Sequence, residues 1–226
     1  MGSPATQNDP DTALVERARR GDTSATEELY RRHARRAYNL AYRMLGNSWD
    51  AADVAQEAFI KAFTALPHFK GEARFTTWFH RIVVNAVYDH LRRSRPEPFA
   101  QEDLDRLSSQ VGADRRATWA GGAQSAVEPA EDGLSPLVRR ALLALNEGFR
   151  LTVVLCDLLG FDYADAAEIL GVQEGTIKSR IFRARAQLAR YLKENGYRPP
   201  ESASAASPPG NPVLPGDVAP EAHYQG

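Results

Sequence analysis

Apolar residues recur at helical spacing in two blocks of this sequence, and a long stretch without periodicity separates them. The first block covers residues 11–94 and the second covers residues 134–196. The intervening residues 95–133 contain prolines, glycines and scattered acids, and they match neither a helical nor a strand repeat. A compact domain rarely includes so long a segment without secondary structure. We therefore predict an all-α protein with two small helical domains joined by a flexible linker.

The two ends of the chain have compositions that do not favour folding. Residues 197–226 hold half of the 14 prolines, with Ser, Ala and Gly between them, and cannot bury enough apolar surface to fold. Residues 1–10 lack the basic and apolar regions of a secretory signal. No run approaches the roughly 18 apolar residues that a membrane span needs. We expect disorder at both ends, a cytoplasmic location and no direct membrane contact.

Start and stop signals divide the first block into helices. Glycine and proline mark the breaks, at Gly21, Gly46 and Pro67, and Ser48 is the expected cap of the third helix. The first predicted helix is short, can be capped by Asp11 or Thr12 and runs through Arg20. The others run over residues 24–45, about 50–66 and 76–93, with a loop over 69–74.

The second block contains the layout of a helix-turn-helix between Tyr163 and Ile181. Ala167 is small where two helices would cross closely, Gly171 permits the turn, and Ile177 can pack the second helix onto the first. These requirements are met together, so we predict this motif. The motif alone does not identify a function, because several classes of DNA-binding protein use it.

A helical wheel gives the second helix of this motif two distinct faces. The expected core face is a narrow apolar stripe of Ile177, Ile181, Ala184 and Leu188. The opposite face carries Lys178, Ser179, Phe182 and Arg183, flanked by Arg180 and Arg185. No acid occurs between Thr176 and Arg190, and a surface that binds phosphates carries one sign of charge. Phe182 can contact a thymine methyl group in the major groove or, alternatively, cover a neighbouring helix.

The fourth helix of the first block also has two faces. Its apolar side consists of Phe79, Ile82, Val83, Ala86 and Val87. Its other side, which we expect to be exposed, carries Trp78, Arg81, Asn85, Tyr88 and Arg92, and Lys70 and Arg74 in the preceding loop extend the basic surface. Interleaved aromatic, amide and basic side chains suit single-stranded nucleic acid, whose bases can stack and be read on their edges. An ordinary amphipathic surface is the alternative interpretation.

The third helix of the first block has an acidic face formed by Asp50, Asp53 and Glu57. An acidic face is unlikely to bind DNA, since both are negatively charged. It favours a basic protein partner, and simple solvation of the face is the alternative.

Three segments of the sequence resemble an extracytoplasmic-function (ECF, group IV) sigma factor of the sigma-70 family. They are Asp50–Phe59 (DAADVAQEAF), Phe69–Asn85 (FKGEARFTTWFHRIVVN) and Gly175–Arg185 (GTIKSRIFRAR), which are similar to that family's second and fourth regions. The resemblance covers about residues 11–94 and 134–195. The long linker and the proline-rich tail depart from the family's minimal form.

The resemblance implies that the first domain binds core RNA polymerase and the minus-ten promoter element, and that the second domain binds the minus-thirty-five element. It also implies an anti-sigma partner, through which alone the protein would be tied to a membrane. The residues expected to contact core polymerase are Asp50, Asp53, Gln56 and Glu57. Those expected at the minus-ten element are Lys70, Arg74, Trp78, Arg81, Asn85, Tyr88 and Arg92. Those expected at the minus-thirty-five element are Thr176, Lys178, Ser179, Arg180, Phe182, Arg183 and Arg185.

Two other classes of protein compete with this interpretation. A polymerase-independent helix-turn-helix regulator would bind a palindromic site by itself, but it leaves the stripe from Trp78 to Arg92 unexplained. An enzyme is not expected, because the five histidines have no metal-ligand spacing and the sequence contains no phosphate loop or nucleophile motif. The single cysteine, Cys156, lies in an apolar run typical of a core residue. We therefore expect no catalytic residue, no metal and no cofactor.

Overall fold

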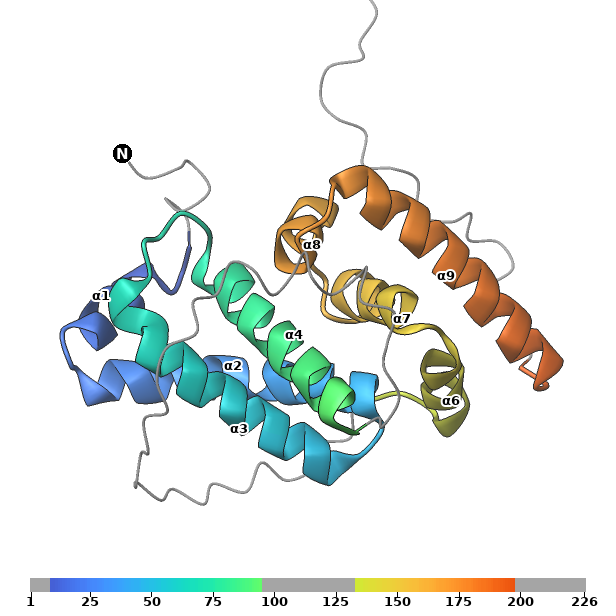
Figure 1. The fold of residues 1–226 in the computed structure, drawn as a ribbon, viewed down its shortest axis with the longest axis horizontal. Coiled ribbons are helices and arrows are strands. Elements are labelled where there is room, and N and C mark those ends of the chain that lie inside the picture. The colour runs from blue at the N-terminus through green and yellow to red at the C-terminus, as the bar shows by residue number, and fades with distance from the viewer. Residues whose placement is uncertain (1–8, 95–132, 198–226) are drawn as a thin grey trace, which may run out of the picture.

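A computed structural model describes residues 9–94 and 133–197, and its regular elements in these ranges are all helical (Figure 1). Most of the predicted linker and tail, and residues 1–8 of the predicted N-terminal segment, lie outside the described residues. Asp9 and Pro10 are described, contrary to the expectation of disorder through residue 10. The Asp9 carboxylate accepts a hydrogen bond of 2.7 Å from the backbone N–H of Phe75, which ties the chain start to the first residue of a later helix.

The first domain contains the helices that the sequence predicts, with small shifts at their ends. They are α1 (Thr12–Arg19), α2 (Thr23–Leu45), α3 (Ser48–Ala65), the short 3-10 helix η2 (Leu66–His68) and α4 (Phe75–Ser94). The cap of α3 differs from the prediction, because Asn47 and not Ser48 accepts the hydrogen bond from the N–H of Trp49, at 2.9 Å. Gly46 ends α2 with a left-handed φ of 74°, a conformation that glycine adopts without strain.

Aromatic rings fill the centre of the first domain, where α2, α3 and α4 pack together. Phe59 from α3 lies 4.6 Å from Phe79 of α4, measured between ring centroids, and Phe75 stacks parallel to Phe79 at 5.9 Å. The whole predicted apolar side of α4 is buried. Burying each large apolar side chain stabilises the domain by about 1.5–3 kcal/mol.

The second domain consists of α6 (Pro136–Ala144), α7 (Glu147–Val153), a π-helical turn η4 (Val154–Leu158), α8 (Tyr163–Leu170) and α9 (Glu174–Glu194). Side chains cap three of these helices: Ser135 caps α6, Asn146 caps α7 and Asp162 caps α8. Gly171 ends α8 with a φ of 62°, so the turn of the helix-turn-helix forms as predicted.

The two domains pack directly against each other, which the sequence does not predict. In Figure 1, α8 lies beside α4 and α6 lies near the end of α2, and these helix pairs are in contact. One apolar cluster continues across the boundary, from Phe79 and Val84 of the first domain to Phe161 and Ala166 of the second. The helices α3 and α9 lie on opposite sides of the molecule (Figure 1).

A buried arginine of α7 joins the ends of two other helices at this boundary. The guanidinium of Arg150 donates hydrogen bonds to four backbone carbonyl groups, those of Leu142, Leu143, Leu145 and Met44. The first three carbonyls belong to the end of α6 and the residue after it, and that of Met44 belongs to the end of α2. Helix C-termini leave carbonyl groups without partners, and a cation there also suits the negative end of the helix dipole.

The described residues contain no group of three or more His, Cys, Asp or Glu side chains that could hold a metal ion. The helices in the same ranges are also too short or too polar to cross a membrane. Cys156 is half-buried, and burial, aided by the charge of Asp157, raises the pKa of its thiol to about 11. A thiol that stays protonated at neutral pH is a poor nucleophile.

Candidate nucleic-acid interfaces

The first candidate surface is the outer face of α9. Its apolar stripe packs inward as predicted: Ile177, Ile181 and Ala184 are buried, and Leu188 is half-buried. The opposite side chains, Lys178, Ser179, Phe182 and Arg183, are all exposed. Phe182 is 76% exposed, so it does not cover a neighbouring helix in this structure. The face therefore presents two cations, a hydroxyl and an apolar ring to solvent.

One of the side chains that flank this face, Arg185, has an internal partner. Arg185 forms two hydrogen bonds to the carboxylate of Asp157, at 2.6 and 3.1 Å, and so braces α9 against the π-helical turn. Thr176 and Arg180 are half-buried. Lys178 pairs with Glu174 at 2.8 Å, but both side chains are about half exposed, and such surface pairs contribute only about 0.3–0.5 kcal/mol. Lys178 can therefore exchange this partner for a phosphate or a base at little cost.

The second candidate surface is the polar side of α4, which is less open than the sequence indicates. Trp78, Arg81, Asn85 and Tyr88 are half-buried, contrary to the expected exposed stripe, and Arg92 is exposed beside Asp89. The covering comes partly from α8 of the second domain, which packs on α4.

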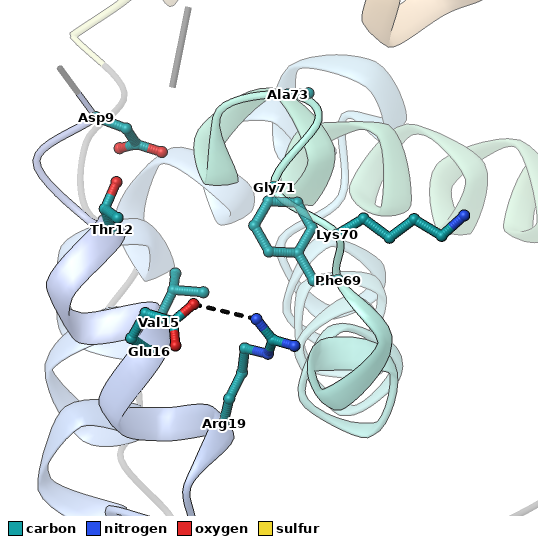
Figure 2. Close-up of a pocket in the computed structure, with 9 residues that line it drawn as sticks. All are labelled: Asp9, Thr12, Val15, Glu16, Arg19, Phe69, Lys70, Gly71 and Ala73. Carbon is teal, nitrogen blue, oxygen red and sulfur yellow. Dashed lines mark hydrogen bonds and ion pairs between the residues drawn. The ribbon is translucent and has the colours of Figure 1, made fainter. Parts of the chain in front are cut away.

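The loop before α4 borders a cavity of about 370 Å³ that faces α1 (Figure 2). Phe69 and Gly71 line it from the loop side, and Thr12, Glu16 and Arg19 line it from α1. The ring of Phe69 also lies 4.8 Å from that of Trp78. Sequence reasoning identified the loop but missed the contribution of α1, because about fifty residues separate the two segments. Gly71 has a φ of 72° and open space around its α-carbon, so the loop backbone can be approached closely.

The third candidate surface is the acidic face of α3, whose charges differ in their surroundings. Partial burial opposes ionisation of Glu57, but Lys61 and Arg93, at 2.8 and 3.2 Å, hold the pKa of its carboxyl below its usual range. Asp50 lies 3.5 Å from the ring nitrogen of His90. Asp53 and Gln56, in contrast, are exposed.

Sequence reasoning missed two apolar residues on the same face of α3. Trp49 is 82% exposed and Ile60 is 42% exposed. At 100° per residue, Trp49, Asp53, Gln56 and Ile60 fall within about 60° of one another. An exposed stripe that combines an aromatic, an aliphatic and a carboxylate is typical of a protein-binding surface. A helical wheel of α3 that included its apolar residues would have identified this stripe from the sequence.

These features define a two-domain helical protein whose second domain presents an outward helix of a helix-turn-helix. Family models for Sigma-70 region 2 and Sigma-70 region 4 match residues 29–97 and residues 136–188. The chain is 40% identical over 173 residues to the ECF RNA polymerase sigma factor SigM of Mycobacterium tuberculosis, an alignment that spans 76% of this chain and 79% of SigM.

Solved structures give the same result. CnrH in complex with the cytosolic domain of CnrY is similar with a TM-score of 0.59 and 25% identity, over 82% of this chain and 98% of that chain. The sigma factor RpoE in complex with the anti-sigma factor NepR from Bartonella quintana is similar with a TM-score of 0.53 and 27% identity, over 74% of this chain and 96% of that chain. The chain belongs to the ECF sigma factors of the sigma-70 family. It is therefore a transcription-initiation factor of the class that acts with RNA polymerase, which is not a class of enzyme.

Proposed function

We propose that this protein directs core RNA polymerase to promoters through three separate surfaces, located on α3, α4 and α9. The observation that carries this proposal is the outer face of α9, where cations and an exposed aromatic ring lie opposite a buried apolar stripe. Such a helix fits the major groove of DNA. We assign this face to the minus-thirty-five element. We also expect the protein to act in the cytoplasm, where the polymerase acts.

Within this face, Arg183 is the base-reading candidate. Its guanidinium is planar and can form two hydrogen bonds with a guanine edge. Lys178 can contact either a base or a phosphate. Arg180 and Arg185 lie at the sides of the face and are assigned to phosphates, with Arg185 releasing Asp157 when it does so.

The minus-ten element is assigned to the polar side of α4 and the loop over residues 69–74. The exposed Lys70 and the half-buried Asn85 and Tyr88 supply charge, edge contacts and stacking for a displaced strand. The cavity between this loop and α1 adds a recess next to the strand-binding side chains.

Core polymerase is assigned to the outer face of α3. Asp53 and Gln56 supply exposed polar groups, and Trp49 and Ile60 add apolar area at the two ends of the stripe. Aromatic residues in such positions carry much of the binding energy at protein interfaces. A further partner is an anti-sigma factor, because RpoE, which is similar to this chain, is solved in complex with one.

Transcription in vitro with purified core polymerase tests these assignments together. Arg183→Ala should weaken holoenzyme binding at the preferred promoter by about 1–3 kcal/mol and relax the preference at one base position. Asn85→Ala should reduce strand opening, read by permanganate footprinting, and leave core binding intact. Charge reversal at Asp53 and Glu57 should weaken co-purification with core polymerase.

Lys193→Ala is the matched control for Arg183→Ala, since it removes one exposed cation about 15 Å farther along α9. It should leave base preference unchanged. Tight promoter binding without polymerase, or repression of an already active holoenzyme, would refute the proposal and favour an ordinary helix-turn-helix regulator.

A further inference from the structure

The start of α4 is capped by a residue from a distant part of the chain. The first residue of this helix is Phe75, and the preceding residue, Arg74, has a side chain that donates hydrogen bonds but cannot accept them. Helix N-termini leave N–H groups without intrahelical partners, and a side-chain oxygen commonly accepts from them. Here the acceptor is the carboxylate of Asp9, 66 positions earlier, whose Oδ2 lies 2.7 Å from the backbone nitrogen of Phe75.

Asp9 is itself held in place by the residues that follow it. Its other carboxylate oxygen, Oδ1, accepts a hydrogen bond of 3.0 Å from the N–H of Asp11, and its carbonyl accepts one of 3.1 Å from the N–H of Thr12. Asp11 is buried, and its carboxylate accepts hydrogen bonds from Arg32 at 3.0 Å and from His33 at 2.7 Å. The two aspartates thus tie the chain before α1 to both α2 and α4.

The contacts of both aspartates meet at Phe75. The ring of His33, which one aspartate holds, lies edge-on to that of Phe75, with 5.2 Å between the ring centroids. Phe75 is buried, and its ring also lies 6.2 Å from that of Phe69 and 5.7 Å from that of Trp78. Phe75 follows directly after the loop assigned to the minus-ten element. Its backbone and its ring therefore determine where this loop enters α4.

The loop is also held at its other end, by the last residue of α1. The guanidinium of Arg19 donates a hydrogen bond of 3.5 Å to the carbonyl of Pro67, just before the loop. Figure 2 shows Asp9 and α1 on one side of the cavity and Lys70 and Gly71 on the other. The segment from Asp9 to Arg19 thus contacts the chain on both sides of the loop. A loop held in this way loses less conformational freedom when it binds a strand.

The negative charge of Asp9 allows two effects on DNA binding to be separated. A carboxylate beside a surface assigned to a DNA strand repels phosphates, so its charge alone would weaken binding. The hydrogen bond to Phe75 has the opposite effect if the strand binds one conformation of the loop, because the apparent affinity scales with the fraction of molecules in that conformation. Removal of the side chain should therefore strengthen binding in the first case and weaken it in the second.

We propose that Asp9 is a positioning residue for minus-ten recognition, because by capping α4 it holds the loop over residues 69–74 in the conformation that receives the promoter strand. The inference rests on the function proposed above, which assigns the loop to that strand. Asp9 acts through the backbone of Phe75 and needs no contact with DNA. It lies outside the two regions that the family models match.

Binding of wild-type and variant holoenzymes to two DNA probes tests the proposal. Both probes derive from a promoter that the wild-type holoenzyme selects from random DNA. One is a fork whose minus-ten strand is unpaired, and the other is a duplex that ends upstream of the minus-ten element. Asp9→Ala should weaken binding to the fork about fivefold, which corresponds to about 1 kcal/mol for a lost cap. Binding to the upstream duplex and to core polymerase should be unchanged.

Two further variants separate the hydrogen bond from the charge. Asp9→Asn removes the charge but keeps an amide oxygen that can accept from Phe75, so it should recover most of the loss. Glu27→Ala removes an exposed carboxylate from α2 and is the matched control, which should bind both probes like the wild type. Fork binding by Asp9→Ala that equals or exceeds that of the wild type overturns the proposal. Equal weakening on both probes also overturns it, because that result indicates general damage to the fold.

Hydrogen exchange at the N–H of Phe75, followed by NMR on the free protein, reports the cap without DNA. Exchange should be about fivefold faster in Asp9→Ala than in the wild type or in Asp9→Asn. The same rate in all three proteins would contradict the cap and overturn the inference alone. If the wild-type holoenzyme binds a fork with a scrambled minus-ten strand equally well, the proposed function of the loop is overturned and this inference with it.

Discussion

His80 should make the stability of this protein fall on mild acidification. The imidazole is completely buried. Its Nδ1 lies 2.8 Å from the carbonyl oxygen of Thr76, which can only accept, so Nδ1 carries the proton of the neutral ring. The other nitrogen, Nε2, is buried and has no hydrogen-bond partner among the described residues. A second proton on this ring would therefore be placed in an apolar site without an acceptor.

The pKa of His80 is lowered from its usual 6.5 to about 3. Burial is the largest cause, the Thr76 carbonyl opposes it, and the charges of Arg36 and His33 lower the pKa further. Below pH 6.5 the unfolded chain binds a proton at this position and the folded chain does not, so stability is lost as the pH falls from 6.5 towards 3. Between pH 7 and pH 5, the linkage relation gives a loss of about 2 kcal/mol.

Urea denaturation at pH 7 and pH 5 measures this loss. His80→Phe removes the titrating group and keeps a ring against Phe161. Between pH 7 and pH 5, the free energy of unfolding of this variant should therefore fall by about 2 kcal/mol less than that of the wild type. His68→Gln, at an exposed position of η2, is the control and should follow the wild type. Equal pH dependence of the wild type and His80→Phe, or an NMR titration of His80 near pH 6.5 in the folded protein, would refute the reasoning.

Two further changes test the packing of the second domain. Arg150→Met removes the side chain that donates to four backbone carbonyl groups, and it should lower the free energy of unfolding, measured by urea denaturation, by about 3–5 kcal/mol. The control Arg140→Met, on the exposed side of α6, should leave that free energy nearly unchanged. Asn146→Ala removes the cap that accepts from the N–H of Phe149 at 2.8 Å and should cost about 1 kcal/mol in the same assay, while Asn146→Asp, which keeps an acceptor, should restore most of that loss.

Features encoded within one helix or one turn are predicted well from this sequence. The break at Gly46, the turn at Gly171 and the buried stripe that begins at Ile177 all appear in the structure. Each depends on local backbone conformation or on helical periodicity, which neighbouring residues determine. The outward direction of Phe182 and Arg183 follows from the same periodicity.

Features that depend on contacts between distant segments are not predicted. The sequence predicts an exposed polar side of α4, but Arg81 and Asn85 are half-buried, and α8 of the second domain packs on this helix. The composition of residues 1–10 predicts disorder at Asp9, and it contains no sign of the hydrogen bond to the N–H of Phe75, which lies 66 positions away. The ion pair between Glu57 and Arg93 is not predicted for the same reason, because Arg93 lies at the end of another helix.

The π-helical turn at Val154–Leu158 changes the angular position of the residues that follow α7. Its wider hydrogen bonding, from the N–H of Leu159 to the carbonyl of Val154 at 3.0 Å, accommodates one residue more than an α-helical turn does. One residue corresponds to about 100° of rotation and 1.5 Å of rise. Deleting a single residue before Asp157 would rotate Asp157 by more than a quarter of a circle relative to α7, so that it would no longer face Arg185 of α9. One additional residue in this turn thus places the carboxylate that holds Arg185, and with it one of the contacts that fix α9 on the second domain.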